Sequence, residues 1–326
     1  MRGGLVAAAA ALSSATLVPA AAQIPPERGL PTVVSLAELV GAGVVSTAGH
    51  ELSPAFNPDG RTFYFVKAGP APERHAHLTI VTSRLEEGRW SEPEIAPFSG
   101  RHSDLDPWIS PDGRRLYFAS DRPLAGSRPG DLNLWMMEWS NGGWGRPAVL
   151  PHPVNSPADE RSPSEAPDGT VYFASDREGG AGSWDLYRAR PAPGLGYGPA
   201  ENLEALNTPG PDVDPRVVSG GGALLFSSPG AGERGAAGDL YLSRLEDGAW
   251  AAPVGLDAVN TVADETAPAL SPDGRYLYFV SDRPFRLSRS RPPDSYAELE
   301  SRLSGPGNGL GDVYRILVQH LGVALP

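Results

Sequence analysis

The 326-residue chain contains no cysteine, which excludes a disulfide framework, a thiol nucleophile and a thiolate metal site. Basic residues are in the minority, since 27 Lys and Arg stand against 39 Asp and Glu for a net charge of −12. Binding to nucleic acid through its phosphates requires a basic surface, so we expect no nucleic-acid partner. A chain of this length can build a core that needs no disulfides.

Motifs that mark common active sites are also missing. The sequence has no Gly-x-Ser-x-Gly nucleophile elbow, no Gly-rich phosphate-binding loop and no His-Glu-x-x-His zinc motif. We therefore predict no catalytic residue and no required cofactor. The sequence favours a protein that is not an enzyme.

Long hydrophobic runs are confined to the N-terminus. A positive start at Met1-Arg2 precedes an apolar stretch from Leu5 to Val18, and small Ala residues lead to Gln23. This order is typical of a cleaved export signal, whereas a membrane anchor would need a longer and less Ala-rich run. We expect a signal peptide at 1–22, a single domain at 23–326 without a transmembrane segment, and a periplasmic or secreted protein.

What the chain has in abundance is Gly and Pro, with 39 and 35 residues, and their placement is periodic. Five segments share a strand, a turn based on Pro-Asp-Gly and an aromatic strand. The turn glycines lie 53, 56, 52 and 53 residues apart, at Gly60, Gly113, Gly169, Gly221 and Gly274. Pro presets φ in such a turn and Gly accepts a positive φ. Two further short strands complete each repeat, so the unit reads as a four-stranded blade.

The repeated pattern resembles that of TolB-like, WD40-like β-propeller proteins. The second repeat shows it in full as LDPWISPDGRRLYFASDR, and an Asp-Leu-Tyr strand such as Asp185–Tyr187 follows in other repeats. The resemblance extends from Glu51 to Val318. It implies an all-β propeller, and it leaves the activity open because such folds host many functions.

The number of blades follows from the strands. The last repeat lacks a fourth strand, and the segment from Thr32 to Val45 precedes the first repeat as a fourth strand should. We predict five four-stranded blades closed by this N-terminal strand, which removes two exposed sheet edges. Six blades are the alternative, although they would require another repeat of chain.

An acidic residue begins the first strand of every repeat. These residues are Glu51, Asp104, Glu160, Asp212 and Glu265, and two repeats add Asp106 and Asp214 directly before the strand's Pro. Propeller topology places them around one mouth of the central channel, opposite the Pro-Asp-Gly turns. In one interpretation each carboxylate caps backbone N–H groups or pairs with the Arg of a Ser-Asp-Arg segment. In the other the ring binds a cation such as Ca²⁺, which takes six to eight oxygen ligands, or a polar ligand.

Positions that break the repeat are further candidates for binding. Strand alternation directs Trp108 and Arg216 into the channel, just below the acids. Glu165 falls in an otherwise apolar row and needs a partner. An insertion at 283–310, with a helix expected over Ser295–Leu303, emerges on the carboxylate face. We therefore predict that a ligand binds on that face.

These observations favour an exported, non-catalytic binding or scaffold protein. We expect a monomer that recognises a protein, peptide or glycan in the cell envelope or outside the cell. The alternative is a carbohydrate-active enzyme, either a glycoside hydrolase or a lyase, that acts at the carboxylate-rich channel mouth.

The export signal gives the first testable prediction. Protein purified from an exporting host should begin near Gln23, because signal peptidase cleaves after small residues. Mass spectrometry of the N-terminal peptide measures this. An intact Met1 in the membrane fraction would show that the segment is not cleaved.

Overall fold

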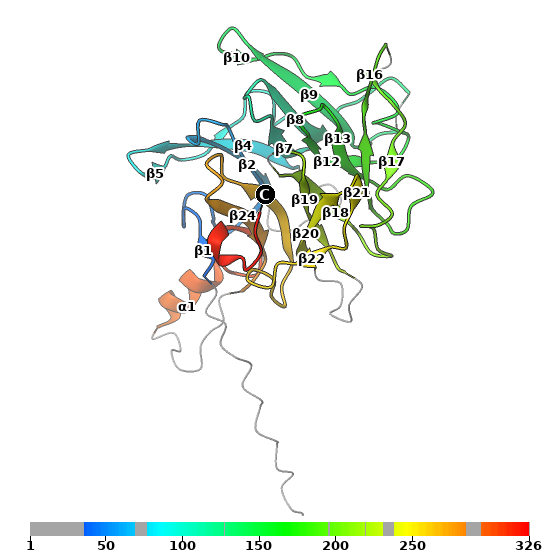
Figure 1. Cartoon of the computed structure of the whole chain (residues 1–326). Coiled ribbons are helices and arrows are strands. Elements are labelled where there is room, and N and C mark those ends of the chain that lie inside the picture. Colours follow the sequence, from blue (N-terminus) through cyan, green and yellow to red (C-terminus); the bar gives the residue numbers. More distant parts are fainter. Residues whose placement is uncertain are drawn as a thin grey trace, which may run out of the picture. The chain divides into compact units, whose positions relative to one another are not determined.

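The computed structural model describes residues 36–68, 77–126, 128–194, 196–218, 220–230, 238–284 and 295–325 (Figure 1). The expected signal peptide at 1–22 lies outside the described residues, and so do residues 285–294 of the insertion. No helix within the described ranges is long and apolar enough to cross a membrane.

Five antiparallel sheets form the blades, and each contains the three inner strands of one repeat. The innermost strands are β2 (His50–Phe56), β7 (Asp104–Ile109), β12 (Glu160–Glu165), β18 (Val213–Val217) and β23 (Glu265–Leu270). The second strands are β3 (Thr62–Ala68), β8 (Arg115–Ser120), β13 (Val171–Ser175), β19 (Ala223–Ser228) and β24 (Tyr276–Ser281). The third strands are β4 (Thr79–Glu86), β9 (Asn133–Ser140), β14 (Asp185–Ala189), β20 (Asp239–Glu246) and β25 (Asp312–Leu317). The predicted five-bladed, all-β propeller is confirmed.

The outermost strand of the first four blades is divided into two short pieces. These pairs are β5 (Arg89–Trp90) with β6 (Glu94–Ile95), β10 (Gly143–Trp144) with β11 (Ala148–Val149), β16 (Gly196–Tyr197) with β17 (Glu201–Asn202), and β21 (Ala249–Trp250) with β22 (Val254–Gly255). A Pro lies between the two pieces each time, as at Pro93 and Pro147. Pro lacks the N–H that a ladder needs, so it interrupts the edge strand and limits its pairing with other chains. A small two-stranded sheet pairs β15 (Pro191–Ala192) with β16.

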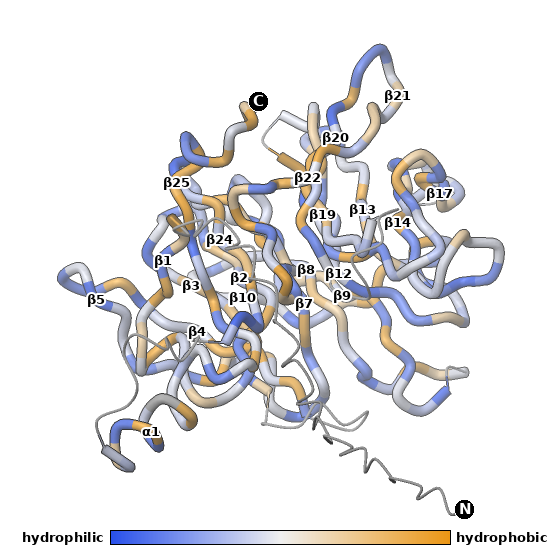
Figure 2. The backbone as a smooth tube through the Cα atoms, turned by 90° about the horizontal axis from the view of Figure 1, so that it is seen from below, coloured by the Kyte–Doolittle hydropathy of each residue, from blue (hydrophilic) through white to orange (hydrophobic). Residues whose placement is uncertain are grey.

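Each second strand is covered on both faces, which explains its apolar and aromatic sequence. In β8 the residues from Leu116 to Ser120 are all buried, and Phe63 and Phe65 of β3 are likewise inaccessible. Neighbouring blades supply the two covers. Figure 2 shows the hydrophobic colour along these central strands, whereas the projecting hairpins near β5 and β21 are hydrophilic at their tips.

The Pro-Asp-Gly turns hold the first two strands of a blade together. In the first blade Gly60 has a φ of +64°, and its N–H donates to the carbonyl of Asn57. The carboxylate of Asp59 accepts the N–H groups of Arg61 at 2.7 Å and Thr62 at 3.0 Å. The side chain therefore satisfies the turn's own backbone, which explains why Asp recurs there.

The ring closes through the N-terminal strand, as predicted. Strand β1 (Glu38–Leu39) pairs antiparallel with β25, so the last sheet has the order β1-β25-β24-β23. The following residues Val40 and Val45 are buried with Phe63 of the first blade and Val313 of the last. This seam joins the two ends of the chain around the ring.

Removing the closing strand should destabilise the whole propeller. We expect deletion through Val45 to lower the melting temperature markedly and to cause aggregation, because it exposes the edge of β25 and uncovers the seam. Circular dichroism and light scattering measure both effects. A matched deletion that ends at residue 34 keeps β1 and should keep the melting temperature. Equal stability of the two truncated chains would disprove closure by this strand.

Candidate functional site

The five repeated acids are fully buried, and their carboxylates bond to groups of the surrounding loops and strands. In four blades the carboxylate accepts the backbone N–H of a Ser or Thr four residues earlier; the pairs are Thr47–Glu51, Ser156–Glu160, Thr208–Asp212 and Thr261–Glu265. In three blades the Arg of the Ser-Asp-Arg segment adds an ion pair; these pairs are Arg122–Asp104 at 2.9 Å, Arg177–Glu160 at 2.9 Å and Arg283–Glu265 at 3.0 Å. The interpretation as caps and Arg partners is therefore correct for this ring.

Two blades depart from this scheme. In the first blade Lys67 replaces the usual Ser and lies 2.5 Å from Glu51. In the fourth blade Pro229 and Gly230 stand where Asp and Arg stand elsewhere, so the segment supplies no cation for Asp212. Burial raises the pKa of Asp212 to about 6, against the hydrogen bonds that it accepts.

A second unneutralised carboxyl lies at the closing seam. Burial raises the pKa of Asp312 to about 7, and the neighbouring Glu51 adds to the shift. The N–H of Gly307 donates to Asp312 at 2.6 Å. Within the described ranges no group of three or more His, Cys, Asp or Glu side chains is arranged to hold a metal ion.

A second, inner ring lies at the residue before the first Pro of each innermost strand. Each strand has a bulge there, and the residue has a positive φ between 50° and 56°; the five are Ser53, Asp106, Ser162, Asp214 and Ala267. This backbone conformation costs a residue with a side chain about 1–2 kcal/mol. The same residues take part in hydrogen bonds between neighbouring blades.

These inter-blade bonds are made by the two Asp residues of the inner ring. Asp106 accepts the hydroxyl of Ser53 at 2.6 Å and the N–H of Ser162 at 3.0 Å. Asp214 accepts the hydroxyl of Ser162 at 2.7 Å and the N–H of Ala267 at 2.9 Å. The predicted binding residues Asp106 and Asp214 thus connect all five blades in sequence.

Two Arg side chains neutralise this inner ring. Arg161 donates to Asp106 at 3.0 Å; burial opposes ionisation of Asp106, but Arg161 and Ser53 outweigh it and keep its pKa below the usual value. Arg216 donates to the carbonyl of Pro163 at 2.8 Å, and its desolvation lowers its pKa despite the nearby acids. Arg161 was not among the residues predicted from the sequence, although it replaces the apolar Leu52 and Leu105 of the first two blades.

A cavity of the channel lies at its other end. A cavity of about 600 Å³ is lined by residues of all five blades, including Trp108, Arg216 and Glu165. Its remaining walls include residues of the turns, among them Pro58, Pro111, Pro167, Asp273 and Gly274. Trp108 and Arg216 therefore line a cavity with the Pro-Asp-Gly turns rather than with the repeated acids. Arg216 does lie close to Asp106 and Asp214, but the cavity that it lines together with Trp108 includes turn residues and none of the five repeated acids.

Glu165 is the buried carboxyl of this cavity. It has the partner that the sequence analysis required, since Arg115 of the second blade lies 2.9 Å away. Burial raises its pKa, whereas Arg115 and Tyr117 act in the opposite direction. The exposed Asp273 accepts the hydroxyl of Ser271 at 2.6 Å and the N–H of Arg275 at 3.1 Å, and these bonds lower its pKa.

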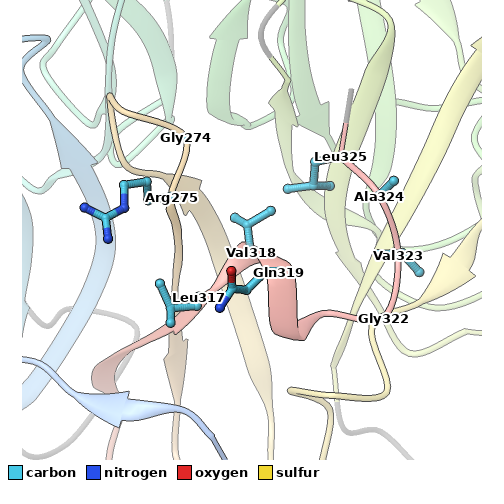
Figure 3. Close-up of a pocket in the computed structure, with 9 residues that line it drawn as sticks. All are labelled: Gly274, Arg275, Leu317, Val318, Gln319, Gly322, Val323, Ala324 and Leu325. Atoms are coloured by element: carbon cyan, nitrogen blue, oxygen red, sulfur yellow. The ribbon is translucent and has the colours of Figure 1, made fainter.

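Another cavity, of about 640 Å³, lies at the C-terminal segment. Leu317, Val318 and Leu325 line it together with Arg275 and Gln319 (Figure 3). Val318 begins a short 3₁₀-helix, Val318–His320. Arg275 is the only ionisable side chain in this lining, so the cavity offers no acid–base pair.

The described end of the insertion lies on the side of the repeated acids, as expected. Its helix α1 (Tyr296–Leu303) is capped by Ser295, which confirms the predicted helix. The side chain of Asn308 donates to the carbonyl of Ala48, close to the start of the first blade. Residues 285–294 of the insertion, which include three Arg residues, lie outside the described residues.

Comparison with known proteins gives distant relatives. The chain is 25% identical over 262 residues to the uncharacterized peptidase YuxL of Bacillus subtilis, covering 79% of this chain and 34% of the relative. It thus spans about a third of that protein. Among solved structures it is similar to an α-L-arabinofuranosidase of Lactobacillus brevis, at 14% identity and a TM-score of 0.49 over 74% of this chain and 85% of that one. A Bacillus subtilis arabinanase has 14% identity and a TM-score of 0.47, covering 83% and 97%. No family model matches the chain.

These comparisons require a correction. The sequence analysis favoured a non-catalytic binding or scaffold protein, whereas the matched relative is named as a peptidase. The expectation that the chain is not an enzyme is therefore wrong. It rested on the absence of short catalytic motifs, and carboxylate chemistry leaves no such motif because its residues come together only in the folded chain.

The buried acids give a prediction for stability. The folded-state pKa of Asp212, about 6, exceeds the value of about 3.9 in an unfolded chain, so the folded state binds its proton more tightly. The free energy of unfolding must then fall as the pH rises between these two values. We expect Asp212→Asn to remove this loss. The melting temperature of the variant, relative to that of the wild type, should therefore rise as the pH increases from 4 to 7.

Asp104→Asn is the matched control for this measurement. It leaves the half-buried Arg122 without its carboxylate partner, which should cost about 3 kcal/mol of stability at neutral pH. Differential scanning calorimetry across the pH range compares the two variants. A constant offset between Asp212→Asn and the wild type at every pH would contradict the raised pKa.

Proposed function

We propose that this chain acts in glycan hydrolysis and that the channel cavity on the turn face holds the reacting sugar. The proposal retains the carbohydrate-active alternative of the sequence analysis and moves its site to the opposite end of the channel. Glu165 is the observation that carries it. This residue is a buried carboxyl with a raised pKa, in the wall of a cavity that also presents Trp108.

The chemistry requires two carboxyl groups in different protonation states. Glu165 is the candidate acid, because burial favours its protonated form. It would give its proton to the glycosidic oxygen as the bond to the anomeric carbon breaks. Asp273 is the candidate carboxylate, since hydrogen bonds favour its ionised form. It would take a proton from the water that attacks the anomeric carbon.

The apolar wall suits a sugar substrate. Trp108 packs against Tyr117, with ring centroids 5.7 Å apart, and both belong to the second blade. Several prolines, including Pro58 and Pro111, complete the rim. Rigid apolar side chains of this kind can cover the C–H face of a sugar ring, while the few polar groups fix its orientation.

Peptide hydrolysis is the second candidate, and the match to YuxL favours it. Because the chain aligns with 34% of that relative, it would then supply the propeller part of a larger hydrolase. The proposed export of the chain suits either activity on a polymer outside the cytoplasm.

Replacing the proposed acid tests the function. We expect Glu165→Gln to lower kcat on a cleaved glycan at least 100-fold, because general acid catalysis typically contributes that much or more. The wild-type rate should also fall as the pH rises through the elevated pKa of Glu165. Release of reducing ends from neutral and acidic polysaccharides measures both, with peptide substrates assayed in parallel.

Glu201→Gln is the matched control. Glu201 lies in the same blade and also pairs with an Arg, Arg188, at 2.9 Å, but it is not among the residues that line the cavity. This variant should keep full activity. Unchanged glycan hydrolysis by Glu165→Gln would refute the site, and cleavage of peptides alone would support the second candidate.

A further inference from the structure

A groove of about 930 Å³ runs between the first and second blades on the turn face. Pro58 lines both this groove and the channel cavity, so the two spaces adjoin. From there the groove passes over the turn of the second blade to the hairpin that connects β9 and β10. A polymer bound in the channel cavity could therefore extend outward along it.

The groove has an excess of positive charge in an acidic protein. Arg84, Arg114 and Arg146 line it and are exposed, and within the described ranges none has a carboxylate within 4.0 Å. Two acids also line it, but Asp59 and Asp112 accept hydrogen bonds from their own turns. Three positive and two negative charges give a local sum of +1, compared with −12 for the chain.

Trp139 breaks the symmetry of the hairpins. It pairs across the hairpin with Trp144, whereas Leu85 and Leu245 hold this register position in the first and fourth blades. Its side chain is 46% exposed and meets the ring of Trp144 edge-on, with centroids 5.0 Å apart. Trp144 is fixed in turn by a hydrogen bond to the hydroxyl of Tyr64 at 3.0 Å. The groove thus has a supported but uncovered aromatic surface.

Glycine keeps the groove open beside this Trp. Gly142 and Gly143 both line it, and a Cβ placed at Gly143 would meet no atom within 4 Å. The space at this position is therefore empty rather than filled by the protein. A side chain at Gly143 would therefore begin in open space.

We propose that this groove binds an acidic glycan, a polysaccharide chain that carries uronic acid residues. Carboxylates along the chain would pair with Arg84, Arg114 and Arg146, which present planar guanidinium groups suited to them. One sugar ring would stack on Trp139. The aromatic surface and the continuity with the channel cavity favour a glycan over an acidic peptide. This inference rests on the proposed function and deepens it, because it names the substrate class.

Binding of oligogalacturonate, a chain of uronic acids, tests the inference. Isothermal titration calorimetry should use Glu165→Gln protein, so that no hydrolysis occurs during the measurement. We expect Arg84→Gln and Arg146→Gln each to weaken binding about tenfold, as loss of one hydrogen bond to a charged group predicts. Trp139→Ala and Gly143→Phe should weaken it similarly, and binding should decline with added salt.

Arg89→Gln is the control, because Arg89 is an exposed hairpin Arg that lines a different groove, between the fifth and first blades. It should leave affinity unchanged. Equal binding of a neutral galactan oligomer, tighter binding of poly-glutamate, or full affinity in the groove variants would each overturn the inference. Because binding is measured without turnover, a lack of hydrolysis by the wild type would refute the proposed function alone.

Discussion

The hydrogen bonds accepted by buried carboxylates are the interaction on which this propeller depends. A carboxylate removed from water is costly unless its oxygens are satisfied, and here one lies at or next to the start of the innermost strand of each blade. Glu160 illustrates the solution, since it accepts the N–H of Ser156 and pairs with Arg177. The preceding loop and the second strand are thereby tied to the first. Every blade thus begins at a defined place around the axis.

Carboxylates two positions farther along the innermost strands join the blades to one another by hydrogen bonds of the same kind. Asp106 and Asp214 accept backbone N–H groups that a positive φ at Ser162 and Ala267 presents to them. The bulges are strained, and the bonds across the blade boundaries offset that strain. One end of the channel is consequently filled by charged groups that neutralise each other, with Arg216 above them.

The proposed site lies at the opposite end, where the repeats differ. Trp108, Glu165 and Arg216 occupy equivalent or adjacent strand positions in different blades, and the other blades place small or apolar residues there. The same holds farther out, since Trp139 replaces a Leu in the hairpin of the second blade. Trp108 and Trp139 make ring contacts within their own blade, whereas Arg216 and Glu165 also bond to neighbouring blades.

The sequence by itself determined the repeat length, the blade count, the closing strand and the helix at 296–303, because turn chemistry, strand patterning and capping act over a few residues. The five repeated acids, and their role as caps, could also be predicted from it. The position of the cavity near the Pro-Asp-Gly turns could not. Trp108, Glu165 and Asp273 lie more than 50 residues apart in the chain, and only the closed ring brings them to one cavity. Nor does the sequence show the positive φ before each Pro, which is stabilised by bonds from a neighbouring blade. Tertiary structure therefore decided which carboxyl groups are bonded between blades and which line the channel cavity, because both depend on neighbours that are distant in the sequence.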